Sequence, residues 1–212
     1  MQINGFDQLN IPADSFDAEK YIESYFDTMR ISEEEKETRR QAARDFREYL
    51  LTLFLLLGIQ SEYLAVNWNI IESEMRTEFE RAALRYANNT QMLRDYIADK
   101  ASDFVRITRE NIDKGEYWVS DERATMEAVN EANEVIGIDD YETAIESGMR
   151  FKEWVTERDN KVRKSHKAVD GKKIPIEEYF VLEKGLMLYP GDYENCPEET
   201  PNCRCTVRYS KN

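Results

Sequence analysis

Apolar residues recur at intervals of three and four along the first half of the chain, in three separate stretches. This spacing keeps them on one face of an α-helix. The stretches are Ala43, Phe46, Leu50, Leu53 and Leu57; then Leu64, Trp68, Ile71, Met75, Phe79, Ala82 and Tyr86; and then Leu93, Ile97, Ala101 and Phe104. Three long helices with short connections predict an antiparallel bundle with these residues in its core. The alternative is a surface offered to a partner, which leaves self-association through these helices open.

Polar residues and glycines mark the expected ends of these helices. Ser32 and Glu35 have the spacing of a capping box, which places a helix start there. Gly58 is expected to end this first helix. The second helix is expected to begin near Ser61 and to stop at the asparagine pair 88–89, and the third to cover residues 91–112.

The 212 residues carry a formal net charge of −14. Broad contact with a nucleic-acid backbone needs clustered lysine and arginine, which neutralise phosphates. The charge therefore argues against direct DNA binding over most of the surface. A local basic run at residues 161–167 is the exception, and we interpret it as a solvated face.

The sequence gives no indication of a membrane partner. Its apolar run, residues 50–57, is far shorter than the roughly 20 residues that a spanning helix needs. Residues 1–5 lack the basic and apolar regions of a signal peptide, and residues 1–16 are expected to form an arm. The three cysteines are therefore expected in a reducing compartment, where close spacing favours metal or thiol chemistry over disulfides.

The sequence pattern changes after Gly115. A fourth helix is expected from Ser120 to about Val135, closed by Gly137, with a further turn or two of helix before Gly148. Short strands are expected at residues 179–182 and 206–209. The sequence thus predicts an α+β fold that is predominantly α: a helical N-terminal region, residues 1–116, followed by a small module with short strands, residues 117–212.

Three elements of the module follow one another in the last sixty residues. The first runs from Trp154 to His166 and reads W-V-T-E-R-D-N-K-V-R-K-S-H; the second is Asp170-Gly171; the third runs from Y-P-G-D at 189–192 to P-N-C-R-C at 201–205. Asp-Gly, Pro-Gly-Asp and Pro-Asn are turn signals, because these residues tolerate special backbone conformations. Cysteines two apart point the same way only where the backbone departs from a regular strand.

The cysteines and the sole histidine allow three interpretations. His166, Cys196, Cys203 and Cys205 would complete a tetrahedral Zn²⁺ site, although a C-x-C pair lacks the spacing of the usual zinc knuckles. Alternatively, the thiols are buried and inert, and a carboxylate such as Asp159 or Asp170 holds the histidine. In the third interpretation, a cysteine and His166 form a nucleophile-base pair that one of these carboxylates orients.

The combined pattern resembles the C-terminal module of the phage Mu F-like head-morphogenesis family, over about residues 120–209. Cys196 lies outside that pattern, so a site with three cysteines is a feature of this chain and not of the family. The resemblance assigns the motif residues a role in holding the module together. These residues are Trp154, Asp159, Arg163, His166, Asp170, Gly171, Asn202, Cys203 and Cys205.

Two functions follow as expectations from the resemblance. The first is a minor capsid protein without enzymatic activity, a low-copy component that acts with the portal and other head or scaffold proteins in procapsid assembly, DNA packaging or ejection. Such a protein would occupy the host cytoplasm during assembly and then the virion head. The alternative is a phage-borne effector or toxin-type enzyme with a site around His166.

Overall fold

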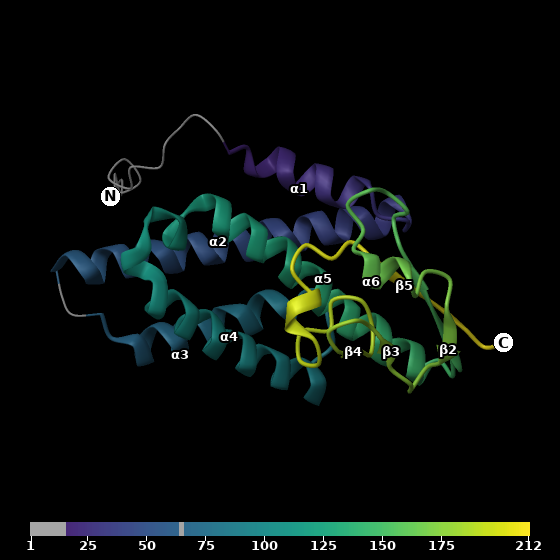
Figure 1. The fold of residues 1–212 in the computed structure, drawn as a ribbon. Helices are drawn as coiled ribbons and strands as arrows, with labels where there is room; N and C mark the ends of the chain where they lie inside the picture. The colour runs from purple at the N-terminus through teal and green to yellow at the C-terminus, as the bar shows by residue number, and fades with distance from the viewer. Residues whose placement is uncertain (1–15, 64–65) are drawn as a thin grey trace.

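The structure is a computed structural model that describes residues 16–63 and 66–212, and it consists of long helices followed by a small antiparallel sheet (Figure 1). The helices are α1 (Ala18–Asp27), α2 (Glu33–Tyr63), α3 (Trp68–Ala83), α4 (Gln91–Asn111), α5 (Asp121–Glu146) and α6 (Lys164–Lys167), with 3-10 helices η2 (Ile112–Lys114), η3 (Glu116–Val119) and η4 (Pro197–Glu199). The strands are β1 (Phe151–Val155), β2 (Lys173–Pro175), β3 (Phe180–Val181), β4 (Leu186–Met187) and β5 (Thr206–Ser210). The expected α+β, predominantly α fold is confirmed. Most of the expected N-terminal arm lies outside the described residues.

The predicted helix starts at Ser32 and Ser120 are confirmed. The Glu35 amide donates to Ser32 Oγ over 3.2 Å, and the Ser32 amide donates to Glu35 Oε2 over 2.9 Å, which completes a capping box. Ser120 Oγ accepts from the amide of Arg123 at the start of α5. These side chains satisfy amides that would otherwise lack a helical partner.

Two predicted glycine stops are wrong. Helix α2 continues through Gly58 to Tyr63, and α5 continues through Gly137 to Glu146. A glycine inside a helix costs only about 1 kcal/mol relative to alanine, which packing on either side outweighs. At Gly137 there is a packing reason as well, because a Cβ there would lie only 3.4 Å from the ring of Tyr189.

The second helix begins later than predicted. Helix α3 starts at Trp68, where the Asn67 side chain caps it, rather than near Ser61, which belongs to α2. The apolar face of α3 is nevertheless as predicted, because Ile71, Met75 and Phe79 are buried. The predicted Leu64 lies outside the described residues.

Helix α5 lies along α2, and both take part in one hydrophobic core with α1, α3 and α4 (Figure 1). Phe46 and Phe79 contact each other in this core, as do Phe54 and Phe104. The core therefore continues across residue 117 into α5. No helix among the described residues is long and apolar enough to cross a membrane.

The sheet has the order β2-β1-β5, with β1 antiparallel to both neighbours. Strands β1, β2 and β4 were not predicted, whereas β3 lies within one predicted segment and β5 covers the other and extends one residue further. Lys152 pairs with Ile174 on one side and Tyr209 on the other, and Trp154 pairs with Val207. A second apolar cluster forms around the buried Trp154 and includes the three cysteines.

Candidate functional site

His166 is held inside the module by the short helix α6. Its side chain is buried, with a residue exposure of 1%. The Trp154 ring meets the imidazole edge to face, with 5.3 Å between the ring centres. Strand β1 supplies Trp154, so the tryptophan and the histidine of the first motif pack directly on each other and fix the orientation of the imidazole.

The two cysteines of the N-C-R-C motif face the same side, because the backbone there is not a regular strand. Asn202 adopts a left-handed conformation with φ 57°, and strand β5 begins only at Thr206. The amide of Cys203 donates to the carbonyl of Thr200, which closes the turn. This is the departure from strand alternation that the C-x-C spacing requires.

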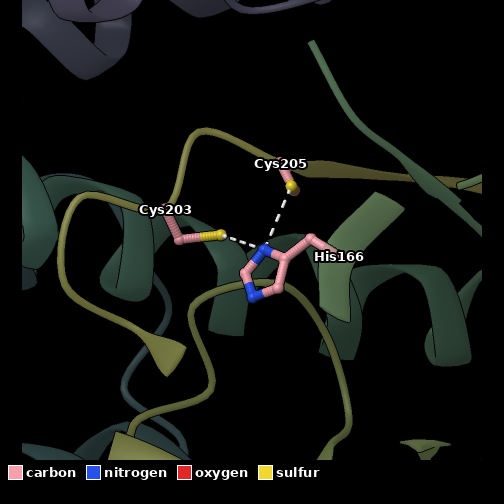
Figure 2. A group of neighbouring side chains, drawn as sticks. All are labelled: His166, Cys203 and Cys205. Atoms are coloured by element: carbon pink, nitrogen blue, oxygen red, sulfur yellow. Dashed lines mark hydrogen bonds between the residues drawn. The ribbon is translucent and has the colours of Figure 1, made fainter. Parts of the chain in front are cut away.

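The imidazole and both sulfurs meet at one point (Figure 2). His166 Nδ1 lies 3.6 Å from Cys203 Sγ and 3.4 Å from Cys205 Sγ. A ligand atom from each of the three side chains lies within 4.8 Å of the other two. The structure thus brings together three of the four residues predicted as zinc ligands.

Cys196 is not part of this group. It is buried in the same apolar cluster, but its sulfur packs against Gly185, where an added Cβ would lie 2.9 Å away. Burial raises the pKa of the Cys196 thiol, as expected for an inert cysteine. All three cysteines are free thiols in this structure.

The carboxylate beside His166 belongs to Glu199, which sequence reasoning did not identify. Glu199 Oε2 lies 3.3 Å from His166 Nε2, an ion-pair distance but not a well-directed hydrogen bond. Glu199 is itself buried and accepts a hydrogen bond from Ser165 Oγ. The 3-10 helix η4 positions it, and a buried glutamate in that short segment has no sequence signature.

Asp159 and Asp170, the two expected partners of the histidine, have other contacts. Asp159 pairs with Arg204, at 2.8 Å, and caps the turn at residues 161–162. Asp170 accepts from the amide of Thr156 and from Arg158 Nε. Both carboxylates have pKa values below their ordinary range, and both stabilise the loops on either side of α6.

The remaining motif residues also fix loops of the module. Gly171 adopts φ 75° and its amide donates to the carbonyl of Trp154. Arg163 donates to the carbonyl of Pro201. Asn202 makes two hydrogen bonds: its backbone N–H donates to Asn130 Oδ1, and its side-chain oxygen accepts from the Tyr21 hydroxyl.

The two neighbouring thiols have pKa values shifted in opposite directions. The pKa of Cys203 lies well below its usual range, because its side chain is hydrogen-bonded to Cys205 and to His166. The pKa of Cys205 is strongly raised by its contact with Cys203 and by burial.

A second buried polar cluster, also missed by sequence reasoning, joins α5 to the Pro-Gly-Asp turn. Glu134 Oε1 accepts from Tyr189 and from the amide of Tyr193. Burial and the nearby Asp192 raise the pKa of Glu134 well above its ordinary value. One turn earlier, Glu131 pairs with the buried Lys100 at 2.8 Å.

A small cavity adjoins the site. His166, Cys203 and Cys205 line it together with Glu157, Lys161, Val162, Arg163, Asn202 and Arg204, and its volume is about 20 Å³. A single water needs about 10–15 Å³ of such space, so the cavity has room for a water or an ion. Cys203, His166 and Glu199 lie in the sequence that a nucleophile, its base and an orienting carboxylate would have, but all three side chains are buried.

One comparison with known proteins finds a match. The family model described as "Phage Mu protein F like protein" matches residues 69–208. That range includes α3, α4, α5 and every motif residue of the module. No curated protein and no solved structure matches significantly.

Proposed function

The chain belongs to the phage Mu protein F-like family, and on that basis we propose that it is a head-morphogenesis protein, a minor capsid component that acts with the portal. The observation that supports this most is the family match over residues 69–208, together with a module in which Trp154, His166, Cys203 and Cys205 pack together. In this proposal the protein acts as a structural part and carries out no reaction.

In this proposal the helical N-terminal region docks on the partner, and the C-terminal module is the rigid part of the protein. Side-chain hydrogen bonds hold the loops of the module in place, as those of Asp170 and Arg163 illustrate. Exposed apolar side chains include Ile70 on α3 and Val181 on strand β3, which pairs with β4. The acidic surface suits a partner with a basic rim and disfavours adhesion to packaged DNA.

Co-expression with the portal, scaffold and major capsid proteins of a phage that encodes such a chain tests the proposal. We expect the chain to co-sediment with procapsids in fewer copies than the capsid subunit, and to be lost from procapsids assembled without the portal. If it stays at the top of the gradient while portal-containing procapsids form, the proposal is wrong.

Two matched surface variants locate the docking end. Ile70→Lys places a charge on the helical body, and Val181→Lys places one on the hairpin; both side chains are about half exposed or more, so the fold should tolerate both. We expect Ile70→Lys to lower co-sedimentation and Val181→Lys to preserve it. The reverse result would assign docking to the module.

A further inference from the structure

Three metal-binding atoms converge on one point, and His166 Nδ1 can exchange a hydrogen bond with only one of the two sulfurs at a time. His166 Nδ1 has either one lone pair or one proton, yet both sulfurs lie within 3.6 Å of it. Without another partner, one of the two thiols must therefore make its contact elsewhere or share a proton with the other. A cation at the centre accepts electron pairs from all three atoms at once.

The distances match those of a tetrahedral zinc centre. Zinc binds imidazole nitrogen at about 2.0–2.1 Å and thiolate sulfur at about 2.3 Å, and tetrahedral angles then separate the two ligand atoms by about 3.5 Å. The two nitrogen-sulfur distances here are 3.4 and 3.6 Å. The two sulfurs lie within 4.8 Å of each other, so all three atoms can be ligands of one ion.

The surroundings also match a metal centre. A metal-bound histidine usually presents its other nitrogen to a carboxylate, which fixes the ring and raises its basicity. Glu199 Oε2 occupies that place at 3.3 Å from Nε2, and His166 Nε2 otherwise lacks a partner among the described residues. Trp154 Nε1 is also buried beside Cys205, where a thiolate would accept a hydrogen bond from the indole N–H.

We propose that His166 Nδ1, Cys203 Sγ and Cys205 Sγ bind one Zn²⁺, with a water from the adjoining cavity in the fourth position and Glu199 as the positioning residue of the imidazole. Two thiolates and a neutral imidazole balance the charge of the ion and suit its preference for sulfur and nitrogen. Cys196 is not a ligand in this proposal.

The ion would add a direct link between two segments that hydrogen bonds such as Arg163 to the Pro201 carbonyl already join. His166 lies on α6, and the cysteines lie just before β5, 37 and 39 positions away. Because the ligand set exists only in the folded chain, binding energy becomes folding energy. The inference concerns the module's stability and is independent of the proposed role in head assembly.

Metal content of the full-length protein is the first test. We expect one equivalent of zinc by elemental analysis. After removal of the metal by chelation, titration with Co²⁺ should give tetrahedral absorption bands, with a charge-transfer intensity corresponding to two thiolates. A protein that binds no Zn²⁺ or Co²⁺ stoichiometrically, or one with a Cys203–Cys205 disulfide in its place, would overturn the proposal. This measurement needs no variant to fold.

Variants then assign the ligands. Cys196→Ser should retain one equivalent of zinc, whereas Cys203→Ser and Cys205→Ser should each lose it. Equal loss in Cys196→Ser, or a cobalt charge-transfer intensity corresponding to three thiolates, would contradict the three-residue site.

Glu199→Gln tests the positioning role. We expect metal affinity to fall about 10- to 100-fold, as for other carboxylates that orient a ligand histidine, with the cobalt spectrum retained at saturation. Ser165→Ala is the matched control, since it removes the hydrogen bond to Glu199 but leaves the carboxylate beside His166. If both variants change affinity equally, Glu199 has no positioning role.

Discussion

Tyr25 donates its hydroxyl hydrogen to the carbonyl oxygen of Cys203 over 2.7 Å, although the two residues lie 178 positions apart. Asn133 on α5 supports this contact twice, because its amide donates to the same carbonyl and to the Tyr25 hydroxyl. Helix α1 lies outside the range of the family match, yet it contacts the loop that carries both cysteines. The N-terminal helix and the module therefore form one hydrogen-bonded unit.

Removing the Tyr25 hydroxyl should weaken this unit. We expect Tyr25→Phe to lower the free energy of unfolding by about 0.5–1.5 kcal/mol, the net value of a typical hydrogen bond, because Asn133 still serves the carbonyl of Cys203. Tyr21→Phe is the control, since its hydroxyl bonds Asn202 at the exposed surface and should contribute less. Chemical denaturation followed by circular dichroism measures both. Equal losses of unfolding free energy in the two variants would show that the buried hydrogen bond stabilises the protein no more than the exposed one.

The buried Glu134 should make the protein less stable as pH rises. Its pKa is raised well above the ordinary 4.5 in the folded chain, by burial first and then by Asp192. Between pH 4.5 and the raised value, the folded state binds a proton that the unfolded state has released, so the free energy of unfolding falls with rising pH. Glu134→Gln resembles the protonated acid and removes this loss.

We therefore expect Glu134→Gln to be at least as stable as the wild type at pH 7, with a difference that shrinks towards pH 4.5. Glu131→Gln is the matched comparison on the same helix: burial raises the pKa of Glu131 as well, but Lys100 opposes that rise, and we expect this variant to be destabilised because it leaves Lys100 without one of its partners. Burial alone would lower the pKa of Lys100, but Glu131 and Glu127 raise it, so Lys100 stays charged and needs its partners. Removing the Glu131 charge should cost roughly 3 kcal/mol. Denaturation curves from pH 4.5 to 8 decide between these outcomes.

Helix faces and caps could be predicted from the sequence because they depend on local spacing. The buried face of α4 and the capping box at Ser32 are examples. Glycine stops could not, because a glycine inside a helix costs only about 1 kcal/mol, and the packing of α2 and α5 on either side of Gly58 and Gly137 outweighs it. A local signal carries no information about that packing.

In the candidate site, too, the features that depend on local spacing could be predicted and those that depend on tertiary packing could not. The motif spacing identified His166, Cys203 and Cys205, and the structure brings these three together. It did not reveal that Cys196 points at Gly185 or that Glu199 stands beside the imidazole, because both depend on how the turn at residues 197–202 folds back. Glu131 and Glu134 were not singled out from the sequence, because only tertiary packing buries them.

Lys152 should give a rise in stability at alkaline pH. Its side chain is buried and donates to the carbonyl of Leu188, and burial lowers its pKa from 10.5 to about 8. Between pH 8 and 10.5 the unfolded chain holds a proton that the folded chain has released, so stability increases with pH. We expect the difference in free energy of unfolding between the wild type and Lys152→Met to rise across this range. The rise should not exceed about 3 kcal/mol, and solvent screening of the charge will make it smaller. A flat difference would mean that Lys152 titrates normally.

Two glycine-to-alanine variants should change stability in opposite directions. Gly58 lies inside α2 with space for a Cβ and no left-handed φ, so Gly58→Ala should raise the free energy of unfolding by up to about 1 kcal/mol through helix propensity. Gly171 also has space for a Cβ, but its φ is +75°, so Gly171→Ala should cost roughly 1–2 kcal/mol from backbone strain alone. Thermal unfolding of both variants beside the wild type measures the contrast. If Gly58→Ala destabilised the protein as Gly171→Ala does, an unbroken α2 through residue 58 would be the wrong description, and the predicted stop would be right.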